Sequence, residues 1–534
     1  MKKIIIAVLA LSACLCAGAQ SKAFRLGQAV EVNTAILQEL NRSYVDTLPV
    51  ARMTTAGINA MLAELDPYTI YVPEEENEDF EMMIGKTYGG IGAIIYKPRK
   101  EEPVLINEPY AGSPAARAGL QCGDAILEID GKTTVGLTAA ESSERMKGKP
   151  GTRVTFHVRK VRSGEIRDIT VTRERIHLPD IEYAGLLDGS KTGYILIGGF
   201  TEGLGAEFRS KVAELKKKGM DKLVIDLRGN GGGILGEAVN IVSAFVPKGS
   251  LVVSSKGNAL VGEQQSRTTL DPIDLKLPLV VLVDSGSASA SEIVSGALQD
   301  MDRATIMGTR TFGKGLVQGI RPLPYNGQLK ITTAKYYTPS GRCVQAIDYS
   351  HRNEDGSVGH IPDSLTHEFK TARGRIVRDG GGITPDVEIK GKEYSRLVYS
   401  LVVSGVIEQY AMEFVKTHES IPAAKDYHFD DYDGFVKFAL GKEFDYRSSA
   451  RANFDQMKKQ LEKDQLADGM KAQLDAMEKA LEISKEDFLR LKKDEIVPFI
   501  EQEIAVRYWY QVGGVEIRLR YDDALRQALA SPLI

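Results

Sequence analysis

An apolar run followed by a serine-rich turn constrains the fold of this chain more than any other stretch. Leu279–Val283 is five consecutive apolar residues rich in Val, which predicts a buried strand. The next seven residues read D-S-G-S-A-S-A, and Ile293, Ala297 and Leu298 then recur at helical spacing. The sequence therefore predicts a strand that ends in a small-residue turn, and a helix that begins near Ala290.

A serine at such a corner lies where negative charge is stabilised. The first N–H groups of a helix have no partner within it, and together with the helix dipole they favour an anion. An attacking serine oxygen needs that stabilisation. The alternative is that the four serines of the turn only cap the helix, since Ser is a preferred N-cap residue. These serines are Ser285, Ser287, Ser289 and Ser291.

A second stretch, T-F-G-K-G-L-V-Q at residues 311–318, contains a lysine in an apolar setting. Lys314 lies between two glycines, beside Phe312 and Val317, with no carboxylate within three residues. Such surroundings remove water and favour the neutral amine. Lys314 could therefore act as the general base for a serine.

Together these two stretches resemble the C-terminal processing, or tail-specific, protease family. The resemblance rests on S-A-S-A-S-E and on a lysine 25 residues after its middle serine, in T-F-G-K-G-x-V-Q. It implies a serine peptidase with a Ser/Lys dyad, in which Ser289 is the nucleophile and Lys314 the base. Gln318, one helical turn after Lys314, matches the family residue that orients the lysine. Asp300 matches a family acid sometimes included with the dyad.

The oxyanion hole is expected in a glycine-rich loop. Val224–Arg228 predicts a strand, and D-L-R-G-N-G-G-G at 226–233 resembles the family's D-L-R-x-N-x-G-G. The resemblance implies that Ala290 shares the oxyanion hole with a glycine of the loop, either Gly232 or Gly233. Two preorganised donors can each contribute about 3 kcal/mol to the transition state. The family usually has Asn and Pro at positions 229 and 231, so glycines there predict a more flexible loop.

Two nucleotide-binding patterns occur, but each lacks a required residue. Gly231, Gly233 and Gly236 match G-x-G-x-x-G, yet the ribose-binding acid is missing, because residues 254–257 read S-S-K-G. Residues 308–315 match the phosphate loop until Gly315 replaces the Mg²⁺-binding Ser or Thr. These absences disfavour a dehydrogenase or an NTPase.

Other catalytic arrangements are disfavoured too. A Ser-His-Asp triad would need His351, His360 or His367, which stand in a polar insert, residues 348–375, and no G-x-S-x-G elbow is present. No H-E-x-x-H or clustered Cys/His occurs, so the sequence implies no metal and no cofactor.

Residues 86–175 resemble a PDZ domain. Y-G-G-I-G-A-I-I at 88–95 resembles the carboxylate-binding loop and its strand, and S-P-A-A-R-A-G-L-Q-C-G-D-A-I-L-E-I-D-G at 113–131 extends the match. Glycines allow several N–H groups to point at one carboxylate while the peptide adds to the sheet edge. The expected peptide-binding residues are Gly90, Ile91, Gly92 and Ala93. The alternative is a generic small β domain.

The N-terminus predicts export. Lys2 and Lys3 precede an apolar run, and residues 17–19, A-G-A, form a small-residue cleavage site, so residues 1–19 are predicted to be a signal peptide. Residues 11–14, L-S-A-C, offer a lipoprotein alternative with a lipid anchor at Cys14. Both predict a bacterial periplasm or cell envelope.

The net charge of −4 disfavours nucleic acid as a partner. Cys122 and Cys343 are not expected to form a disulfide.

The predicted fold is α/β and multidomain. Residues 20–85 form an N-terminal helical region, in which Ile58, Met61, Leu62 and Leu65 make an apolar stripe expected to pack in a core. The resemblance implies an α+β, crotonase-like βαβ catalytic core of the S41 type at 176–390, with the PDZ domain inserted before it. Residues 391–534 predict a helical C-terminal extension.

In that extension, a stripe of apolar residues predicts a helix that packs on a partner helix. The stripe is Met470, Leu474, Met477 and Leu481. The partner helix lies either in this chain or in a second copy, so a homodimer is one alternative.

The sequence as a whole predicts an exported serine endopeptidase. We expect it to recognise the C-terminal tails of envelope proteins through its PDZ domain and to cleave them through an acyl-enzyme. The alternative is a catalytically silent, PDZ-containing peptide-binding scaffold or chaperone.

Overall fold

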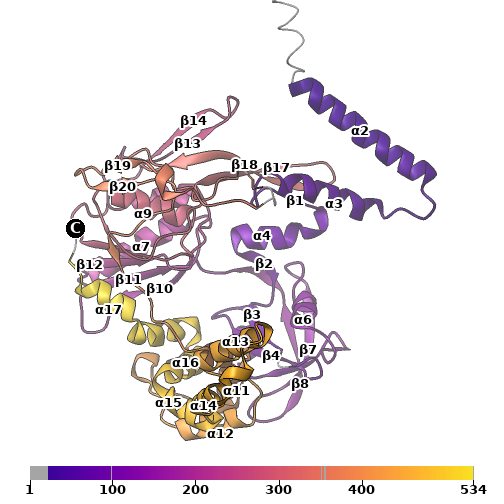
Figure 1. Ribbon diagram of the computed structural model, residues 1–534, viewed down its shortest axis with the longest axis vertical. Coiled ribbons are helices and arrows are strands. Elements are labelled where there is room, and N and C mark those ends of the chain that lie inside the picture. The colour runs from indigo at the N-terminus through magenta and orange to yellow at the C-terminus, as the bar shows by residue number, and fades with distance from the viewer. Residues whose placement is uncertain (1–21, 98, 350–351, 354–356, 533–534) are drawn as a thin grey trace, which may run out of the picture. The chain divides into compact units, whose positions relative to one another are not determined.

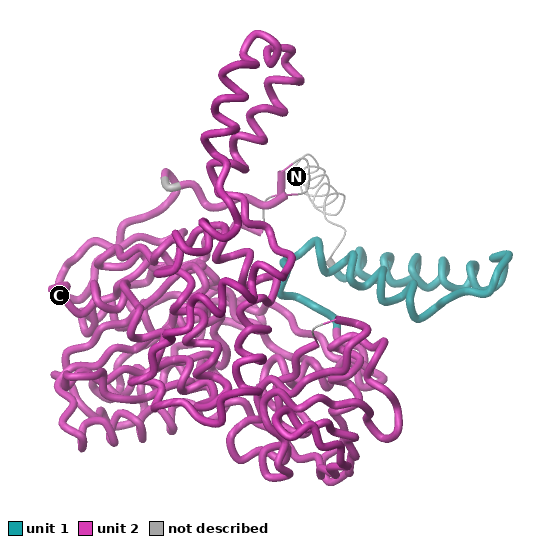
Figure 2. The backbone as a smooth tube through the Cα atoms, turned by 90° about the horizontal axis from the view of Figure 1, so that it is seen from below, with its two compact units in different colours: residues 1–71 teal, residues 72–534 magenta. Residues whose placement is uncertain are grey.

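The computed structural model describes residues 22–532, except 98, 350–351 and 354–356, and divides into two compact units, residues 1–71 and 72–534 (Figure 2). The expected signal peptide and Cys14 lie outside the described residues. The first unit contains α2 (Lys22–Ser43) and α3 (Val50–Ala63). The expected core packing of the stripe on α3 is wrong, because α3 buries none of its residues. Apolar periodicity predicts that a helix forms, but it does not show which other part of the chain would bury the apolar side of that helix.

The second unit is built on a six-stranded sheet. Its strands are, in spatial order, β10 (Ile181–Leu186), β11 (Thr192–Ile197), β12 (Lys222–Asp226), β15 (Leu279–Val283), β16 (Thr305–Gly308) and β21 (Val387–Glu388). All neighbours are parallel except β10 and β11. Helix α7 (Leu204–Lys217) connects β11 to β12, and α9 (Ala290–Asp300) connects β15 to β16. The predicted βαβ core is therefore confirmed.

The two faces of this sheet are covered by different parts of the chain (Figure 1). Helices α7, α9 and α8 (Leu235–Val242) bury one face in the largest apolar cluster. The other face packs against α17 (Asp523–Ala530) and the end of α16 (Lys493–Tyr521). The last helices of the C-terminal extension are therefore a structural layer of the catalytic core.

A second sheet lies beside the loop that contains Lys314. Its strands include β13 (Leu251–Gly257), β14 (Glu263–Arg267), β17 (Leu316–Pro322) and β18 (Gln328–Tyr337). Strand β17 begins two residues after Lys314 and pairs antiparallel with β18. A short hairpin, β19 (Glu368–Lys370) and β20 (Ile376–Arg378), begins in the polar insert and ends just after it.

The expected PDZ module has its own sheet and its own apolar core. Its elements are β3 (Ala93–Tyr96), β4 (Val104–Pro109), α5 (Pro114–Arg117), β5 (Ala125–Ile129), β6 (Lys132–Thr133), α6 (Ala139–Met146), β7 (Arg153–Arg159) and β8 (Ile166–Thr172). Helix α4 (Asn77–Gly85) leads into it. Strands β2 (Thr87–Gly90) and β9 (Glu174–His177) pair where the chain enters and leaves the module. This pairing closes the module as an insertion.

The C-terminal region is helical, as predicted, and has a separate apolar core. Its helices are α10 (Arg396–Val403), α11 (Val406–Thr417), α12 (Tyr432–Leu440), α13 (Ser449–Lys463), α14 (Lys471–Ala480), α15 (Lys485–Leu491), α16 and α17. In the predicted stripe on α14, Leu474 is buried, whereas Met470 and Met477 are exposed. The stripe is thus only partly covered within one chain.

The C-terminal helices also contact the PDZ module. Gln511 N donates to Glu108 Oε1 at 3.1 Å, and Arg507 Nη2 donates to Asn107 Oδ1 at 3.0 Å. The free Cys122 thiol lies 3.8 Å from the Met412 sulfur. Within the described part of the chain, every helix is too short or too polar to cross a bilayer.

Candidate active site

Ser289 lies at the predicted corner between strand β15 and helix α9, at the N-cap position of α9. Its backbone has φ 55° and ψ −111°, a conformation that non-glycine residues rarely adopt. Such strain costs of order 1–3 kcal/mol and persists only where surrounding contacts hold it. Two contacts do so: Ser289 N donates to Glu292 Oε2 at 2.9 Å, and the buried Tyr336 hydroxyl donates to Ser289 O at 3.1 Å.

The other serines of the turn have different surroundings. Ser287 Oγ donates to Leu227 O at 2.7 Å, and Ser291 Oγ donates to Asn230 O at 2.9 Å. Both hydroxyls therefore hold the turn against the glycine-rich loop. Ser285 is exposed, whereas Ser289 is half-buried. Among the four serines, Ser289 alone combines partial burial with a strained backbone.

Glu292 joins the serine turn to the lysine loop. Its side chain is buried completely. Oε2 accepts hydrogen bonds from Ser289 N at 2.9 Å and Lys314 N at 2.8 Å. Oε1 accepts from Gly313 N at 2.7 Å and from the Thr311 hydroxyl at 2.6 Å. One carboxylate thus holds together the backbones of the two segments that the sequence singled out.

Burial raises the pKa of Glu292 above its ordinary value, because the charged form loses water, while the four donated hydrogen bonds oppose the shift. Sequence reasoning gave this residue no role. Its position three residues after Ser289 matches the S-x-x-E pattern of a capping box, and that pattern could have indicated it.

Lys314 is half-buried in the loop between β16 and β17. Gln318 lies within strand β17, so the expected helical turn between the two residues is wrong. The segment pairs with β18, which imposes an extended backbone. The side chain of Gln318 is half-buried, and its Nε2 donates to Thr332 Oγ1 at 3.2 Å.

The glycine-rich loop lies against the serine turn. An ideal Cβ on Gly232 would lie 2.7 Å from Ala290 N and 2.8 Å from Ser289 Cβ, so only glycine fits there. An ideal Cβ on Gly233 would instead lie 2.4 Å from Phe200 O. The loop is braced by the buried Asn230, whose Nδ2 donates to Ile197 O at 2.6 Å.

Among the expected oxyanion donors, the N–H of Gly232 is engaged, since it donates to Asn230 Oδ1 at 2.8 Å. Neither Ala290 N–H nor Gly233 N–H has an acceptor among the residues that the structure describes. The two glycines therefore differ. Gly232 lets the loop lie close to Ser289 and Ala290, whereas Gly233 has an N–H group that is available to an oxyanion.

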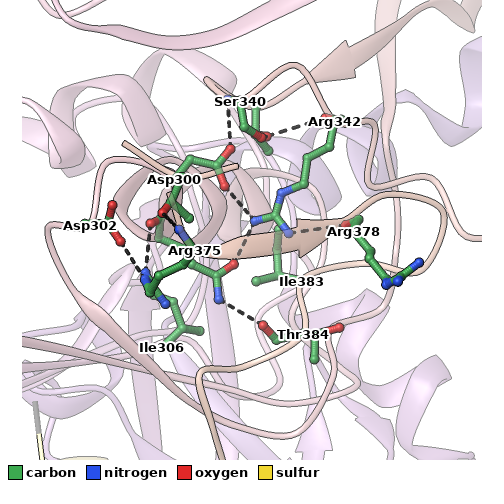
Figure 3. Close-up of polar contacts among 12 residues, drawn as sticks. Asp300, Asp302, Ile306, Ser340, Arg342, Arg375, Arg378, Ile383 and Thr384 are labelled. Atoms are coloured by element: carbon green, nitrogen blue, oxygen red, sulfur yellow. Dashed lines mark hydrogen bonds and ion pairs between the residues drawn. The ribbon is translucent and has the colours of Figure 1, made fainter. Parts of the chain in front are cut away.

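Asp300 lies at the opposite end of α9 from Ser289, and an 11-residue helix is about 16 Å long. Figure 3 shows its surroundings. Its Oδ1 accepts from Arg342 Nη2 at 2.8 Å, and its Oδ2 accepts from Ser340 N at 3.0 Å. The side chains of this ion pair are each 1% exposed. The position of Asp300 therefore does not support the expected catalytic role.

The expected carboxylate loop of the PDZ module precedes strand β3, which is an edge strand of its sheet. Ile91 O accepts from Ala115 N and Gly92 O accepts from Tyr110 N, both at 2.9 Å, which fixes the loop. The N–H groups of Ile91 and Gly92 have no acceptor among the described residues. Gly90 lies in β2 and Ala93 begins β3. The arrangement suits a peptide carboxylate at the end of an added strand.

The two described histidines of the polar insert make no hydrogen bond to the serine turn. His360 and His367 are exposed, and His367 pairs with Asp379 at 3.3 Å. His351 lies outside the described residues. Across the described residues, no cluster of His, Cys, Asp and Glu could hold a metal ion.

Three family models match parts of this chain. The model of peptidase family S41 matches residues 191–350, a PDZ domain model matches 105–160, and a model described as "Probable PDZ-protease, C-terminal helical domain" matches 397–531. The chain is 36% identical over 316 residues to a carboxy-terminal-processing protease of Bartonella bacilliformis, covering 58% of this chain and 71% of that protein.

Two further proteins are similar to this chain. A "Probable CtpA-like serine protease" of Staphylococcus aureus is also 36% identical, over 307 residues, covering 57% of this chain and 60% of that protein. Among solved structures, the photosystem II D1 C-terminal processing protease is 27% identical, with a TM-score of 0.36, covering 65% of this chain and 84% of that one.

Proposed function

Since this chain belongs to the carboxy-terminal processing proteases of peptidase family S41, and is therefore a serine-type peptidase with a PDZ domain, we propose that Ser289 and Lys314 form its catalytic dyad. The observation that carries this proposal is the Glu292 carboxylate. It binds the backbones of Ser289 and Lys314 at 2.9 and 2.8 Å, so the two segments cannot separate without breaking buried hydrogen bonds.

In the proposed reaction, the neutral Lys314 amine takes the proton of Ser289 Oγ as this oxygen attacks a peptide carbonyl. The oxyanion accepts hydrogen bonds from Ala290 N–H and Gly233 N–H, both of which are open. The C–N bond breaks, and Lys314 gives its proton to the leaving amine. Water then hydrolyses the acyl-enzyme, with Lys314 again as the base.

The remaining site residues have supporting roles in this proposal. Gln318 orients Lys314 from strand β17. Asp300 is structural, because its contacts lie at the far end of α9. No metal or cofactor takes part in the proposed steps.

The proposed substrates are proteins of the cell envelope with exposed C-terminal tails. The N–H groups of Ile91 and Gly92 would bind the terminal carboxylate, and the tail would add to the free edge of β3. The export of the chain to a bacterial periplasm or envelope is proposed from residues 1–19. N-terminal sequencing of the mature protein from fractionated cells tests it: Gln20 as the first residue supports a cleaved signal peptide, and a lipidated Cys14 supports the lipoprotein.

The test of the catalytic proposal is hydrolysis of a fluorogenic peptide with an apolar C-terminus by wild type and Ser289→Ala. Loss of hydrolysis in the variant is expected. Ser285→Ala is the matched control, because this serine is exposed in the same turn and has no proposed role. Equal behaviour of wild type and Ser289→Ala would instead favour a peptide-binding scaffold or chaperone.

A homodimer through the C-terminal helices is proposed from the exposed half of the α14 stripe. Met470 and Met477 are 42% and 51% exposed. Sedimentation of wild type and of the double variant Met470→Lys, Met477→Lys tests it. A dimer in wild type that dissociates in the variant is expected, and equal association states would remove α14 from the interface.

A further inference from the structure

Arg228 immediately precedes the glycine-rich loop and lies between two carboxylates from distant parts of the chain. Its Nε donates to Oδ1 of Asp226, the last residue of strand β12, at 3.0 Å. Its Nη2 donates to Asp522 Oδ2 at 2.5 Å, and its Nη1 donates to Asp522 Oδ1 at 3.3 Å. Asp522 stands between α16 and α17, in the C-terminal helical region. The guanidinium therefore joins the catalytic sheet to the last helices of the chain.

The contacts continue from Arg228 into the proposed active site. Gly229 N donates to Asp284 Oδ1 at 2.8 Å, and the same oxygen accepts from Gly286 N at 2.9 Å. Asp284 and Gly286 belong to the serine turn, whereas Gly229 opens the loop that lies against Ser289. A displacement of Arg228 would thus be transmitted to both loops.

Asp522 is itself held in place by the fold. Its Oδ1 accepts from Leu525 N at 2.8 Å, which caps α17. Leu525 is 3% exposed and packs in the apolar cluster on the second face of the catalytic sheet. The side chain of Asp522 is 10% exposed. The Asp522 carboxylate is therefore held in one position, in which it pairs with Arg228.

Packing alone does not confine the Arg228 side chain. It lines a cavity of about 530 Å³, which is also lined by Gly229, Asp284, Tyr394 and Phe499. A long side chain beside such a space has other rotamers available once a partner is removed. The ion pairs with Asp226 and Asp522 together select one of them, and Asp522 is the partner that comes from the C-terminal helical region.

We propose that Asp522 is a positioning residue for peptide cleavage, which fixes Arg228 and, through it, the glycine-rich loop that provides an oxyanion donor. The C-terminal helical region then positions a loop of the catalytic site, in addition to packing against the catalytic sheet. This inference rests on the proposed function, because the loop matters only if Ser289 attacks a carbonyl there.

The test is Asp522→Asn, which removes the charge but retains a side chain that caps helices well. We expect kcat for the fluorogenic peptide to fall about ten- to one hundred-fold, since small misplacements of catalytic groups have effects of that size. KM should stay within about two-fold of wild type, because the PDZ module and its contacts are untouched. Amide hydrogen exchange in residues 228–234 should become faster.

Asp433→Asn is the matched control. Asp433 also pairs with an arginine of the C-terminal helices, Arg490, at 2.6 Å, but the pair lies on the surface, far along the chain from Arg228. We expect this variant to leave kcat, KM and the exchange of residues 228–234 unchanged. A loss in this control equal to that in Asp522→Asn would show a general effect of the helical region and would overturn the inference.

A double-variant cycle provides a second route if Asp522→Asn folds poorly. Arg228→Lys keeps the charge but loses the fork that binds two carboxylates. If Asp522 acts through Arg228, the double variant should be no less active than the worse single variant. Additive losses would overturn the inference.

The outcomes separate this inference from the function on which it rests. A wild-type protein without Ser289-dependent hydrolysis would contradict the proposed function, and the exchange measurement would still show whether Asp522 orders the loop. A wild-type protein that cleaves, with Asp522→Asn equal to it in kcat and in exchange, would contradict the inference alone.

Discussion

The two ends of helix α9 differ in backbone strain and in hydrogen bonding, although each end has a residue that matches a position of the family motif. At the N-terminal end, Ser289 has a strained backbone, and the Ala290 N–H is open. At the C-terminal end, Asp300 is fully paired with Arg342 and Ser340 N. Strain and open donors are typical of a site that binds a reacting group. A buried ion pair whose polar groups all have partners is typical of a structural network. The local surroundings of Ser289 and Asp300 therefore distinguish a catalytic from a structural role, which the motif alone does not.

The largest expected effect is that of Ser289→Ala at the N-terminal end. Removing the nucleophile should lower kcat/KM by about 10³-fold or more, because no acyl-enzyme can form. The unfolding midpoint should stay close to that of wild type, since the Glu292 and Tyr336 contacts are made by the backbone of residue 289. Peptide hydrolysis and thermal unfolding check the two statements. Substantial activity in this variant would remove the proposed difference between the two ends.

Glu292→Gln is expected to have the next largest effect. A glutamine has one acceptor oxygen, so two of the four hydrogen bonds to the serine turn and the lysine loop are lost. We expect kcat to fall about 10²-fold through misplacement of the dyad, and the free energy of unfolding to fall by about 1–3 kcal/mol. Urea unfolding followed beside peptide hydrolysis measures both. A variant with wild-type kcat would show that Glu292 does not position the dyad.

The same residue predicts a pH dependence. Burial raises the pKa of Glu292, so its contribution to stability is fully present below its unfolded-state pKa and is lost as pH rises through the higher folded-state pKa. Activity should move the other way. Protonation turns one oxygen into a donor that faces the N–H groups it bonded before, which are Gly313 N for Oε1 or Ser289 N and Lys314 N for Oε2. The serine turn or the lysine loop is then held less firmly, so kcat should fall as pH falls through the raised pKa. Protonation of the base Lys314 should lower kcat at acidic pH in both proteins. A pH profile of kcat should therefore show one more acidic ionisation in wild type than in Glu292→Gln.

A smaller effect is expected for Gln318→Ala. Gln318 is half-buried and has one side-chain hydrogen bond, to Thr332, in strand β17. If it orients Lys314, kcat should fall about ten-fold, with the free energy of unfolding nearly unchanged. Thr332→Val is a useful comparison, because it removes the partner of Gln318 and leaves its amide in place. Wild-type kinetics in Gln318→Ala would contradict the orienting role.

The smallest effect on activity is expected for Asp300→Asn at the C-terminal end. Removing one partner of a buried ion pair leaves the Arg342 charge uncompensated, which should cost about 3 kcal/mol or more of unfolding free energy. At temperatures where the variant is folded, its kcat should equal that of wild type. A folded variant that had lost activity as severely as Ser289→Ala would make Asp300 catalytic and would break the comparison.

The sequence predicted the central architecture well, because its strongest signals are local. The run at 279–283 is strand β15, and α9 begins at Ala290, as the apolar run and the helical spacing indicated. The PDZ module, of which residues 105–160 match a PDZ domain model, has its own sheet and apolar core because its turns and strands carry their own glycine and apolar patterns. The resemblance to the protease family also led to the serine turn and the lysine loop, which the fold brings together.

The features that the sequence missed depend on contacts between distant segments. The α3 stripe has the right helical period, yet its residues find no cover in their own unit. Gln318 was placed in a helical turn because a spacing of four suits a helix, but pairing of β17 with β18 decides for a strand. The packing of α17 on the catalytic sheet joins residues about 300 positions apart, as the Arg228–Asp522 pair shows, and no local pattern predicts it.

The most direct test of the Ser289–Lys314 dyad is capture of the acyl-enzyme. A labelled peptide is mixed with the protein, the reaction is stopped with acid within one turnover, and the intact protein mass is recorded before digestion maps the modified residue. The proposed dyad predicts an acyl group on Ser289 in wild type, and none in Ser289→Ala or Lys314→Met. An acyl group on another residue, or undiminished acylation in Lys314→Met, would contradict it.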